Sequence, residues 1–239
     1  MVKITGQSDK RSFIVSDKFF KVRQHPDVWA NNRKICSGVV NMTPWHHASL
    51  NYGNVNIKVR KAWNAPEPIW RNEVIYYNTV VLSLVSILNK IVIHHTNNSK
   101  SILYNEKKQQ SRGYAALGYH FFIDQKGTVY EGRPLEVMGS HAGTGVSSGP
   151  LNDPDWGAIG IVLQGDFHHK DDWFSSTNAT NNQLIILEKL IVQLKCKYCI
   201  NQLLMHREVI RSGKPTVCPG DHLVPIIQKL RMKLKMKGR

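Results

Sequence analysis

The sequence lacks the long apolar run that would mark a membrane span. Its longest candidate, VVLSLVSILNKIVI, is too short to cross a bilayer and is interrupted by Ser, Asn and Lys. The N-terminal segment MVKITGQSDKRSF has no apolar core of the kind that a secretory signal peptide carries. Four cysteines in 239 residues are too few for a disulfide framework. The composition, 41% hydrophobic and 21% charged, is that of a globular protein.

Acidic residues are also scarce. The chain has 17 Asp and Glu against 32 Lys and Arg, which gives a net charge of +15. Such an excess attracts polyanions of any kind, but no nucleic-acid-binding motif is present, so we expect no specific nucleic-acid partner. The last twelve residues, QKLRMKLKMKGR, hold six cations and no acid. They are either a solvated helix end favoured by the helix dipole or a tail that makes weak contact with an anionic envelope.

The distribution of apolar residues divides the chain into two parts. Residues 1–56 lack clear periodicity, and PWHHASLNYG within them predicts a loop. We therefore expect an N-terminal extension of unknown role at 1–56 and a folded domain at 57–239, which includes the basic C-terminal helix. Strand and helix patterns mix in the domain without strict alternation. This predicts the α/β class, with a single mixed β-sheet flanked by helices.

Several segments predict individual elements of this sheet. KIVIHHT is typical of a buried strand that ends in two histidines, and GYHFFIDQKGTVYEGR predicts a hairpin. The continuous apolar run AIGIVLQG predicts a strand in the interior of the sheet. Leucines at helical spacing predict a helix over Asn181–Cys196, capped by Asn181 or Asn182, and a second amphipathic helix near the C-terminus.

Three residues at the ends of predicted elements form a candidate zinc set. His94 ends one strand, His206 ends a short strand candidate, and Cys218 follows twelve residues later beside a Pro-Gly turn. Catalytic zinc takes three protein ligands and keeps a fourth position open. Spacing alone leaves two alternatives: structural histidines with a simple turn, or a metal site. It also does not decide between His94 and His95, which face opposite sides of a strand.

Five motifs follow one another along the chain: IVIHHT, LGYHFFIDQKGTVYEGR, GSHAGTG, AIGIVLQGDF and MHREV…TVCPG. In this order they resemble the zinc-dependent N-acetylmuramoyl-L-alanine amidases, a family whose fold is shared by peptidoglycan recognition proteins and amidase-type phage lysozymes. IKVRKAWNAPEP is similar to the segment that opens that domain. The resemblance therefore covers roughly residues 57–230 and implies the amidase/peptidoglycan recognition protein fold.

The resemblance also implies roles for particular residues. His94, His206 and Cys218 correspond to the ligands of one Zn²⁺ per chain. Tyr119 of GYHF stands where the family keeps a tyrosine that assists catalysis, and Thr216 stands near the position of the attacking water. Zinc acidifies water and stabilises an oxyanion, and the phenol of Tyr119 is expected to donate a hydrogen bond to that oxyanion.

Two more residues are expected to bind substrate. His141 belongs to the glycine-rich segment GSHAGTG, and Trp156 precedes the AIGI strand in a segment that lines the groove in the family. A polar loop position is the alternative for His141. Glu131 and Glu208 are expected to pair with Arg133 or a neighbouring cation, which leaves the general base unidentified.

The function implied is hydrolysis of the amide bond between N-acetylmuramic acid and L-alanine in bacterial peptidoglycan. The alternative is a recognition protein that binds peptidoglycan without cutting it; such relatives typically lose the cysteine ligand, and Cys218 is present. Without a signal peptide, we expect the protein to act at the periplasm or cell wall after lysis, as a phage endolysin, or after specialised secretion. In the latter case it would be an antibacterial effector with an immunity protein as partner.

Overall fold

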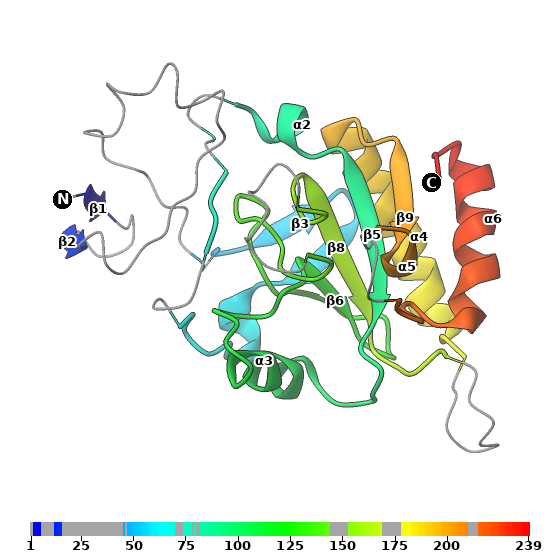
Figure 1. The fold of residues 1–239 in the computed structure, drawn as a ribbon, viewed down its shortest axis with the longest axis horizontal. Coiled ribbons are helices and arrows are strands. Elements are labelled where there is room, and N and C mark those ends of the chain that lie inside the picture. Colours follow the sequence, from blue (N-terminus) through cyan, green and yellow to red (C-terminus); the bar gives the residue numbers. More distant parts are fainter. Residues whose placement is uncertain are drawn as a thin grey trace.

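A mixed sheet of seven strands with helices on both faces forms the body of the protein (Figure 1). The computed structural model describes residues 2–5, 12–15, 45, 47–69, 74–77, 79, 82–143, 153–168, 178–209 and 215–239. Two short strands near the N-terminus, β1 (Val2–Thr5) and β2 (Ser12–Val15), pair with each other in a separate antiparallel sheet. In the described part of the chain, no helix is both long and apolar enough to cross a membrane.

The seven strands lie in the order β3–β4–β7–β6–β8–β5–β9. Their bounds are β3 (Leu50–Tyr52), β4 (Val55–Lys58), β5 (Lys90–His95), β6 (Phe121–Ile123), β7 (Val129–Glu131), β8 (Ala158–Leu163) and β9 (Gln202–Met205). Neighbours among β6, β8, β5 and β9 run parallel, and β6 and β7 form the antiparallel hairpin predicted from GYHFFIDQKGTVYEGR. Every residue of β8 is buried, which confirms the interior position predicted for AIGIVL.

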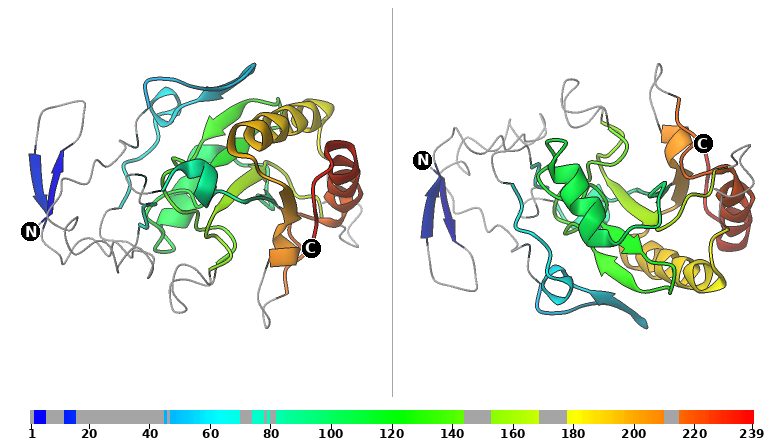
Figure 2. Two further views of the ribbon diagram at one scale, coloured as in Figure 1. Left: turned by 90° about the horizontal axis from the view of Figure 1, so that it is seen from above. Right: turned by 90° about the horizontal axis from the view of Figure 1, so that it is seen from below.

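Helices cover the two faces of the sheet unequally (Figure 2). They are α2 (Leu84–Ile87), α3 (Ile102–Gln110), α4 (Asn181–Tyr198), α5 (His206–Val209) and α6 (Val224–Leu234), with 3₁₀ turns η1 (Arg60–Trp63) and η4 (Asp221–Leu223). Helices α4 and α6 pack on Ile91 and Ile93 of β5 in the main core. Helix α3 packs through Ile102 on Phe122 and Val162, on the opposite face.

This arrangement decides which histidine of the HH pair can enter the site. Side chains alternate along a strand, so His95 faces the same side as Ile93, toward the α4–α6 core, where its ring lies beside Phe167. His94 points to the other side, and its neighbour on β8, Val162, packs on Ile102 of α3. The strand pattern alone allows either His94 or His95 to enter the site. Because the side of the sheet that carries His95 is covered by α4 and α6, His94 is the one that faces the site.

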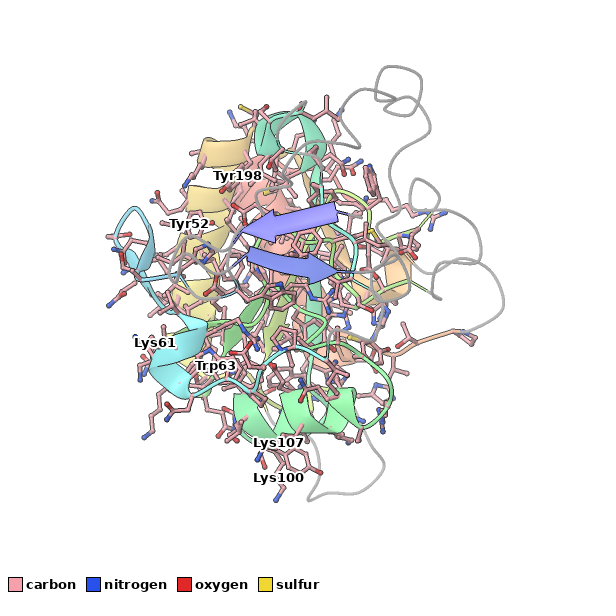
Figure 3. The ribbon with its side chains drawn as sticks, turned by 90° about the vertical axis from the view of Figure 1, so that its left-hand side faces the viewer. Tyr52, Lys61, Trp63, Lys100, Lys107 and Tyr198 are labelled. Atoms are coloured by element: carbon pink, nitrogen blue, oxygen red, sulfur yellow. The ribbon has the colours of Figure 1, made fainter. Side chains whose placement is uncertain are left out.

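The start of the sheet differs from the sequence-based expectation. The loop predicted for Pro44–Gly53 is wrong for Leu50–Tyr52, because these residues form β3 and pair with β4. Tyr52 is buried, and its hydroxyl lies 3.4 Å from that of Tyr198 on α4. Both side chains are labelled in Figure 3. Residue 56 lies within β4. The sheet therefore begins, at β3, before the domain boundary predicted between residues 56 and 57. A three-residue strand is too short for its alternation to stand out.

The N-terminus of α4 is also corrected. Thr180 caps this helix rather than Asn181 or Asn182, which lie in its first turn. The Thr180 hydroxyl accepts from the Gln183 N–H, and the Gln183 side chain accepts from the Thr180 N–H, which forms a reciprocal capping box. The threonine signal was present in the sequence as T-x-x-Q, directly before the apolar pattern.

Candidate metal centre

The ends of two neighbouring strands bring His94 and His206 together. In the parallel pair β5–β9, Ile93 lies opposite Met205, so the next residue on each strand reaches the same level. The two imidazole centroids are 4.5 Å apart. His94 is fully buried, whereas His206 is partly exposed at the start of α5. Sheet pairing thus joins two residues that are far apart in the sequence.

Cys218 completes the cluster from a turn. Its Sγ lies 3.7 Å from His94 Nδ1, and the ligand atoms of His94, His206 and Cys218 all lie within 4.8 Å of one another. Zinc bonds of about 2.1 Å to nitrogen and 2.3 Å to sulfur in a tetrahedral site place these two atoms roughly 3.6 Å apart. The donor set and its spacing therefore fit a zinc ion, and the structure brings together the three residues predicted as ligands.

Burial sets the protonation states of these groups. It lowers the pKa of His94 well below the usual value, with a further contribution from His141 and His206. Burial and then His141 lower the pKa of His206 to about 4. Both imidazoles are therefore neutral at pH 7 and have a lone pair for a metal. Burial raises the pKa of Cys218 to about 12, so the thiol would release its proton when it binds a metal.

Tyr119 flanks the cluster, and its catalytic role stays a prediction. Its ring centroid lies 5.0 Å from that of His94 and 6.0 Å from that of His141, with which it is stacked. Burial raises the pKa of the Tyr119 phenol above the usual value, and nearby Cys218 adds to the shift. The phenol is therefore protonated at neutral pH and able to donate a hydrogen bond.

Thr216 has a clear place in the turn that carries Cys218. Its Oγ1 accepts a hydrogen bond of 3.2 Å from the Cys218 backbone N–H. The hydroxyl hydrogen stays available as a donor, because the hydroxyl acts here through an oxygen lone pair. The contact gives Thr216 a structural role in the turn, and its catalytic role stays a prediction.

His141 lies against His94 and has a fully buried side chain. Its Nδ1 is 2.9 Å from His94 Nε2 and 3.0 Å from Asp155 Oδ1. Because Nδ1 carries at most one proton, it either donates to the carboxylate or accepts from His94. His141 therefore touches a candidate ligand residue, and its predicted contact with substrate remains a prediction.

The predicted site residues omit Asp155, which organises the segment around His141. Its carboxylate accepts hydrogen bonds of 3.0, 2.9 and 2.8 Å from the backbone N–H groups of His141, Ala142 and Gly143. Burial on its own raises the pKa of Asp155. The charge of His141 and these hydrogen bonds outweigh burial and hold that pKa below its usual range. Asp155 stands next to Trp156 in the segment that the resemblance places along the groove, but no spacing rule distinguishes its carboxylate from that of Asp153 or assigns it a role.

His120 and Gly160 support His141 from the sheet. His120 Nδ1 accepts from the Gly160 N–H at 3.0 Å, and its Nε2 lies 2.9 Å from the Val137 oxygen, to which it donates. A Cβ atom on Gly160 would lie 2.3 Å from the His141 ring. Only glycine lets the ring lie this close to β8.

Trp156 lies near the other end of β8. It precedes the first residue of that strand, whereas His94 pairs with Val162 near the last. The Trp156 ring packs edge-on against Tyr77, with centroids 5.1 Å apart, at the border of the main core. The predicted role of Trp156 in substrate binding stays a prediction, and these contacts give the ring a packing role.

The two glutamates in the motifs are held by structural contacts. Glu131 lies 2.5 Å from His47 Nδ1. The expected alternative partner, Arg133, instead donates to the carbonyl oxygens of Leu117 and Met138. Glu208 accepts from Arg231, a cation on α6. Both carboxylates are therefore bound outside the histidine–cysteine cluster.

Known proteins share this fold and sequence pattern. Residues 86–221 match the N-acetylmuramoyl-L-alanine amidase family. The chain is 32% identical over 124 residues to peptidoglycan recognition protein 1 of Bos indicus, a match that covers 50% of this chain and 55% of that protein. It thus spans little more than half the length of that relative. Over 114 residues it is 32% identical to the endolysin of Klebsiella phage KP32, covering 48% of this chain and 66% of the phage protein.

A solved structure extends the likeness to three dimensions. The N-acetylmuramoyl-L-alanine amidase LysC from Clostridium intestinale URNW superposes with a TM-score of 0.51 at 33% identity, over 65% of this chain and 91% of that one. The family match takes in more than half of the sequence, including His94, His206 and Cys218. This chain therefore belongs to the N-acetylmuramoyl-L-alanine amidase family.

Proposed function

We propose that this protein uses zinc to hydrolyse the amide bond that joins N-acetylmuramic acid to L-alanine in bacterial peptidoglycan. One observation carries the proposal: the ligand atoms of His94, His206 and Cys218 gather within 4.8 Å of one another, beside a protonated Tyr119. The amidase family and the phage endolysin among the relatives support peptidoglycan as the substrate.

The donor set favours a catalytic metal over a structural one. Structural zinc sites in proteins are closed by four protein ligands, whereas catalytic sites use three and leave a position for water or substrate. Two neutral imidazoles and one thiolate leave a net charge of +1 with Zn²⁺. Bound zinc would supply a Lewis acid that polarises a carbonyl and makes water more acidic.

The chain's own groups orient the reaction around this position. The Tyr119 phenol, kept protonated by burial and by Cys218, donates to the amide oxygen as that oxygen gains negative charge. The Thr216 hydroxyl has a hydrogen free to orient the water or the substrate. His141 faces Nε2 of His94 at 2.9 Å, and a hydrogen bond donated from that Nε2 would leave His94 Nδ1 free to bind the metal. Asp155 in turn accepts a hydrogen bond from the backbone N–H of His141.

The basic C-terminus supports a weak contact with the anionic envelope, although part of its charge is already paired. Lys233 binds Glu188, and Arg231 binds Glu208. Lys229 and Lys235 are exposed and available to a polyanion. We place the reaction at the periplasm or cell wall, reached by lysis or specialised secretion; an immunity protein belongs only to the second route and remains a prediction.

Digestion of purified peptidoglycan tests the proposal. Mass analysis should find stem peptides that begin with a free L-alanine amino group. Their release should stop with a chelator, return with zinc, and be missing for Cys218→Ala. Wild-type protein that binds sacculi but releases no such peptides would instead be a recognition protein, the alternative function for this family.

A further inference from the structure

We propose that Arg207 is a positioning residue that holds Cys218 in place for metal binding. Its backbone and side chain donate hydrogen bonds to the Cys218 turn (residues 215–220), and its guanidinium also binds the carboxylate of Asp221. The inference rests on the proposed function, because it takes Cys218 as a metal ligand.

Cys218 needs such a restraint more than the two histidines do. His94 is the fifth residue of β5 and lies between two paired strands, and His206 directly follows β9. Cys218 stands outside any strand or helix, in a turn closed by hydrogen bonds from Cys218 N to Thr216 Oγ1 and from Gly220 N to Val217 O. These short-range bonds shape the turn but do not attach it to the sheet.

The backbone of His95, the last residue of β5, forms a hydrogen bond with the Cys218 thiol, and Arg207 attaches the backbone of the turn. Its backbone N–H donates to Cys218 O at 3.0 Å, and its Nε donates to the same oxygen at 3.4 Å. Its Nη2 donates to Val217 O, and its Nη1 donates to Asp221 Oδ1 at 2.8 Å. One planar guanidinium thus holds the chain on both sides of the Cys218 side chain. Since Arg207 directly follows His206, it fixes the thiol relative to another ligand.

Asp221 extends the attachment to the segment after β8. Its second oxygen, Oδ2, lies 2.8 Å from His168 Nδ1. The backbone N–H of the next residue, His222, donates to Phe167 O at 3.1 Å. The turn is therefore held from α5 by Arg207 and from the segment after β8 by Phe167 and His168.

We expect these contacts to position Cys218 rather than to add much to the stability of the fold. The side chains of Arg207 and Asp221 are 27% and 47% exposed, and an exposed ion pair of this kind adds little to stability. The fork of the guanidinium, however, satisfies two carbonyl groups and a carboxylate in one plane, which a lysine ammonium cannot reproduce. Loss of Arg207 should therefore loosen Cys218 without unfolding the protein.

Zinc affinity, measured by competition with a chromogenic chelator, tests the inference. Groups that orient metal ligands typically change affinity 10- to 100-fold, and we expect a loss in this range for Arg207→Gln. Arg207→Lys keeps the charge and should lose nearly as much. Arg112→Gln removes an exposed cation after α3 and should bind zinc like the wild type.

A spectrum separates a displaced ligand from a general loss of stability. In the cobalt-substituted protein, the thiolate-to-cobalt absorption band should weaken or shift in Arg207→Gln and stay unchanged in Arg112→Gln. The unfolding midpoint of the metal-free protein should match the wild type in both. Asp221→Asn, a change at an exposed side chain, should weaken zinc binding several-fold, and combining it with Arg207→Gln should add little.

The outcomes distinguish this inference from the proposed function. If the wild type binds zinc and both Arg207→Gln and Asp221→Asn bind it equally well with unchanged cobalt spectra, the positioning role is wrong and the proposed function stands. If the wild type itself binds no zinc, the proposed function fails and takes the inference with it. Should Arg207→Gln fail to fold, Asp221→Asn alone decides, and unchanged affinity in that variant overturns the inference.

Discussion

At the scale of single residues, burial decides which groups can act. It keeps the imidazoles of His94 and His206 neutral and the phenol of Tyr119 protonated, while His141 and then the backbone N–H groups of Gly143 and Ala142 keep the Asp155 carboxylate ionised. Burial would also raise the energy of any charged group that lacks a partner. The site therefore combines two neutral imidazoles, one phenol that can donate a hydrogen bond, and the Asp155 carboxylate, whose charge is balanced by its hydrogen bonds.

Removal of the Tyr119 hydroxyl tests this division of roles. Tyr119→Phe should lower kcat about 10²- to 10³-fold, the usual cost of losing a donor to a developing oxyanion. Zinc content should remain that of the wild type, because the phenol is not among the three candidate ligands. Kinetics on purified peptidoglycan and metal analysis of the same preparation measure the two effects. An empty metal site in Tyr119→Phe would contradict the assignment.

The sequence was informative about the residues of the site, but only in combination with a resemblance. Spacing left His94 and His95 equivalent, and the choice follows from the helices that cover the α4–α6 face. The roles expected for His94, His206 and Cys218 came from motif order. Asp155 is absent from the predicted site residues because its contacts with the His141 ring and with three backbone N–H groups arise only in the folded chain.

At the scale of elements, buried polar groups join the strands and helices around the site. His120 bridges β8 and the segment after β7: its Nδ1 accepts from Gly160, and its Nε2 donates to Val137. Burial lowers the pKa of His120 to about 3, and the neighbouring His141 contributes. A proton on Nδ1 would break the bond from Gly160.

The His120 pKa predicts a loss of stability in acid. Between pH 6.5 and pH 3, the unfolded chain binds a proton at this imidazole that the folded protein does not bind. The free energy of unfolding should therefore fall as the pH falls, by about 2 kcal/mol at pH 5 from this group alone. Urea unfolding at pH 7 and pH 5 measures the change. His120→Gln cannot titrate there and should show a smaller fall; an equal fall in this variant would contradict the prediction.

A buried ion pair ties η1 to α3. Arg60 donates to both oxygens of Glu106 at 2.7 and 3.0 Å, and both side chains are fully buried. The guanidinium lies over the rings of Trp45 and Trp63, at 5.1 and 5.3 Å from their centroids. The pair locks α3 against the start of the domain, next to the face that carries His94.

Breaking this pair from one side should cost much more than breaking an exposed one. Arg60→Met leaves Glu106 buried without its partner, and we expect a loss of about 3–5 kcal/mol in the free energy of unfolding. Adding Glu106→Leu removes the stranded charge and should restore part of the loss. Urea denaturation of both variants measures the difference, and a loss in Arg60→Met below about 1 kcal/mol would refute it.

The elements that the sequence predicted are those with long patterns. The apolar runs of β5 and β8 and the leucine spacing of α4 and α6 extend over enough residues to show their period. The short strand β3 did not, because three residues cannot establish an alternation. Its place in the sheet is set by pairing with β4 and by the contact of Tyr52 with Tyr198, both of them tertiary effects.

At the scale of the whole molecule, cations outnumber acids on the described surface. Among the described acids, Glu67 and Asp221 are exposed, and four others are partly exposed: Asp124, Glu136, Glu188 and Glu208. The large excess of cations therefore faces solvent, where it attracts anionic polymers. If the protein acts on an anionic wall, this electrostatic attraction should raise its concentration at the wall.

Salt should weaken that attraction without affecting the cluster. Retention of Cys218→Ala, which should not digest the wall, on purified sacculi is expected to fall steeply as sodium chloride rises from about 0.05 to 0.5 M, because screening shortens the reach of surface charge. A pelleting assay measures the bound fraction. Zinc affinity of the wild type over the same range should change little, and salt-independent retention would contradict an electrostatic contribution.

The central claim is that His94, His206 and Cys218 hold one zinc ion. Titration of metal-free protein with zinc, followed by the signal of a competing chelator, tests it most directly. We expect tight binding of one ion per chain, with little or none for His94→Ala, His206→Ala or Cys218→Ala, each still folded by circular dichroism. Wild-type protein that takes up no zinc, or folded variants that bind it as tightly as the wild type, would show that these three residues do not form a zinc site.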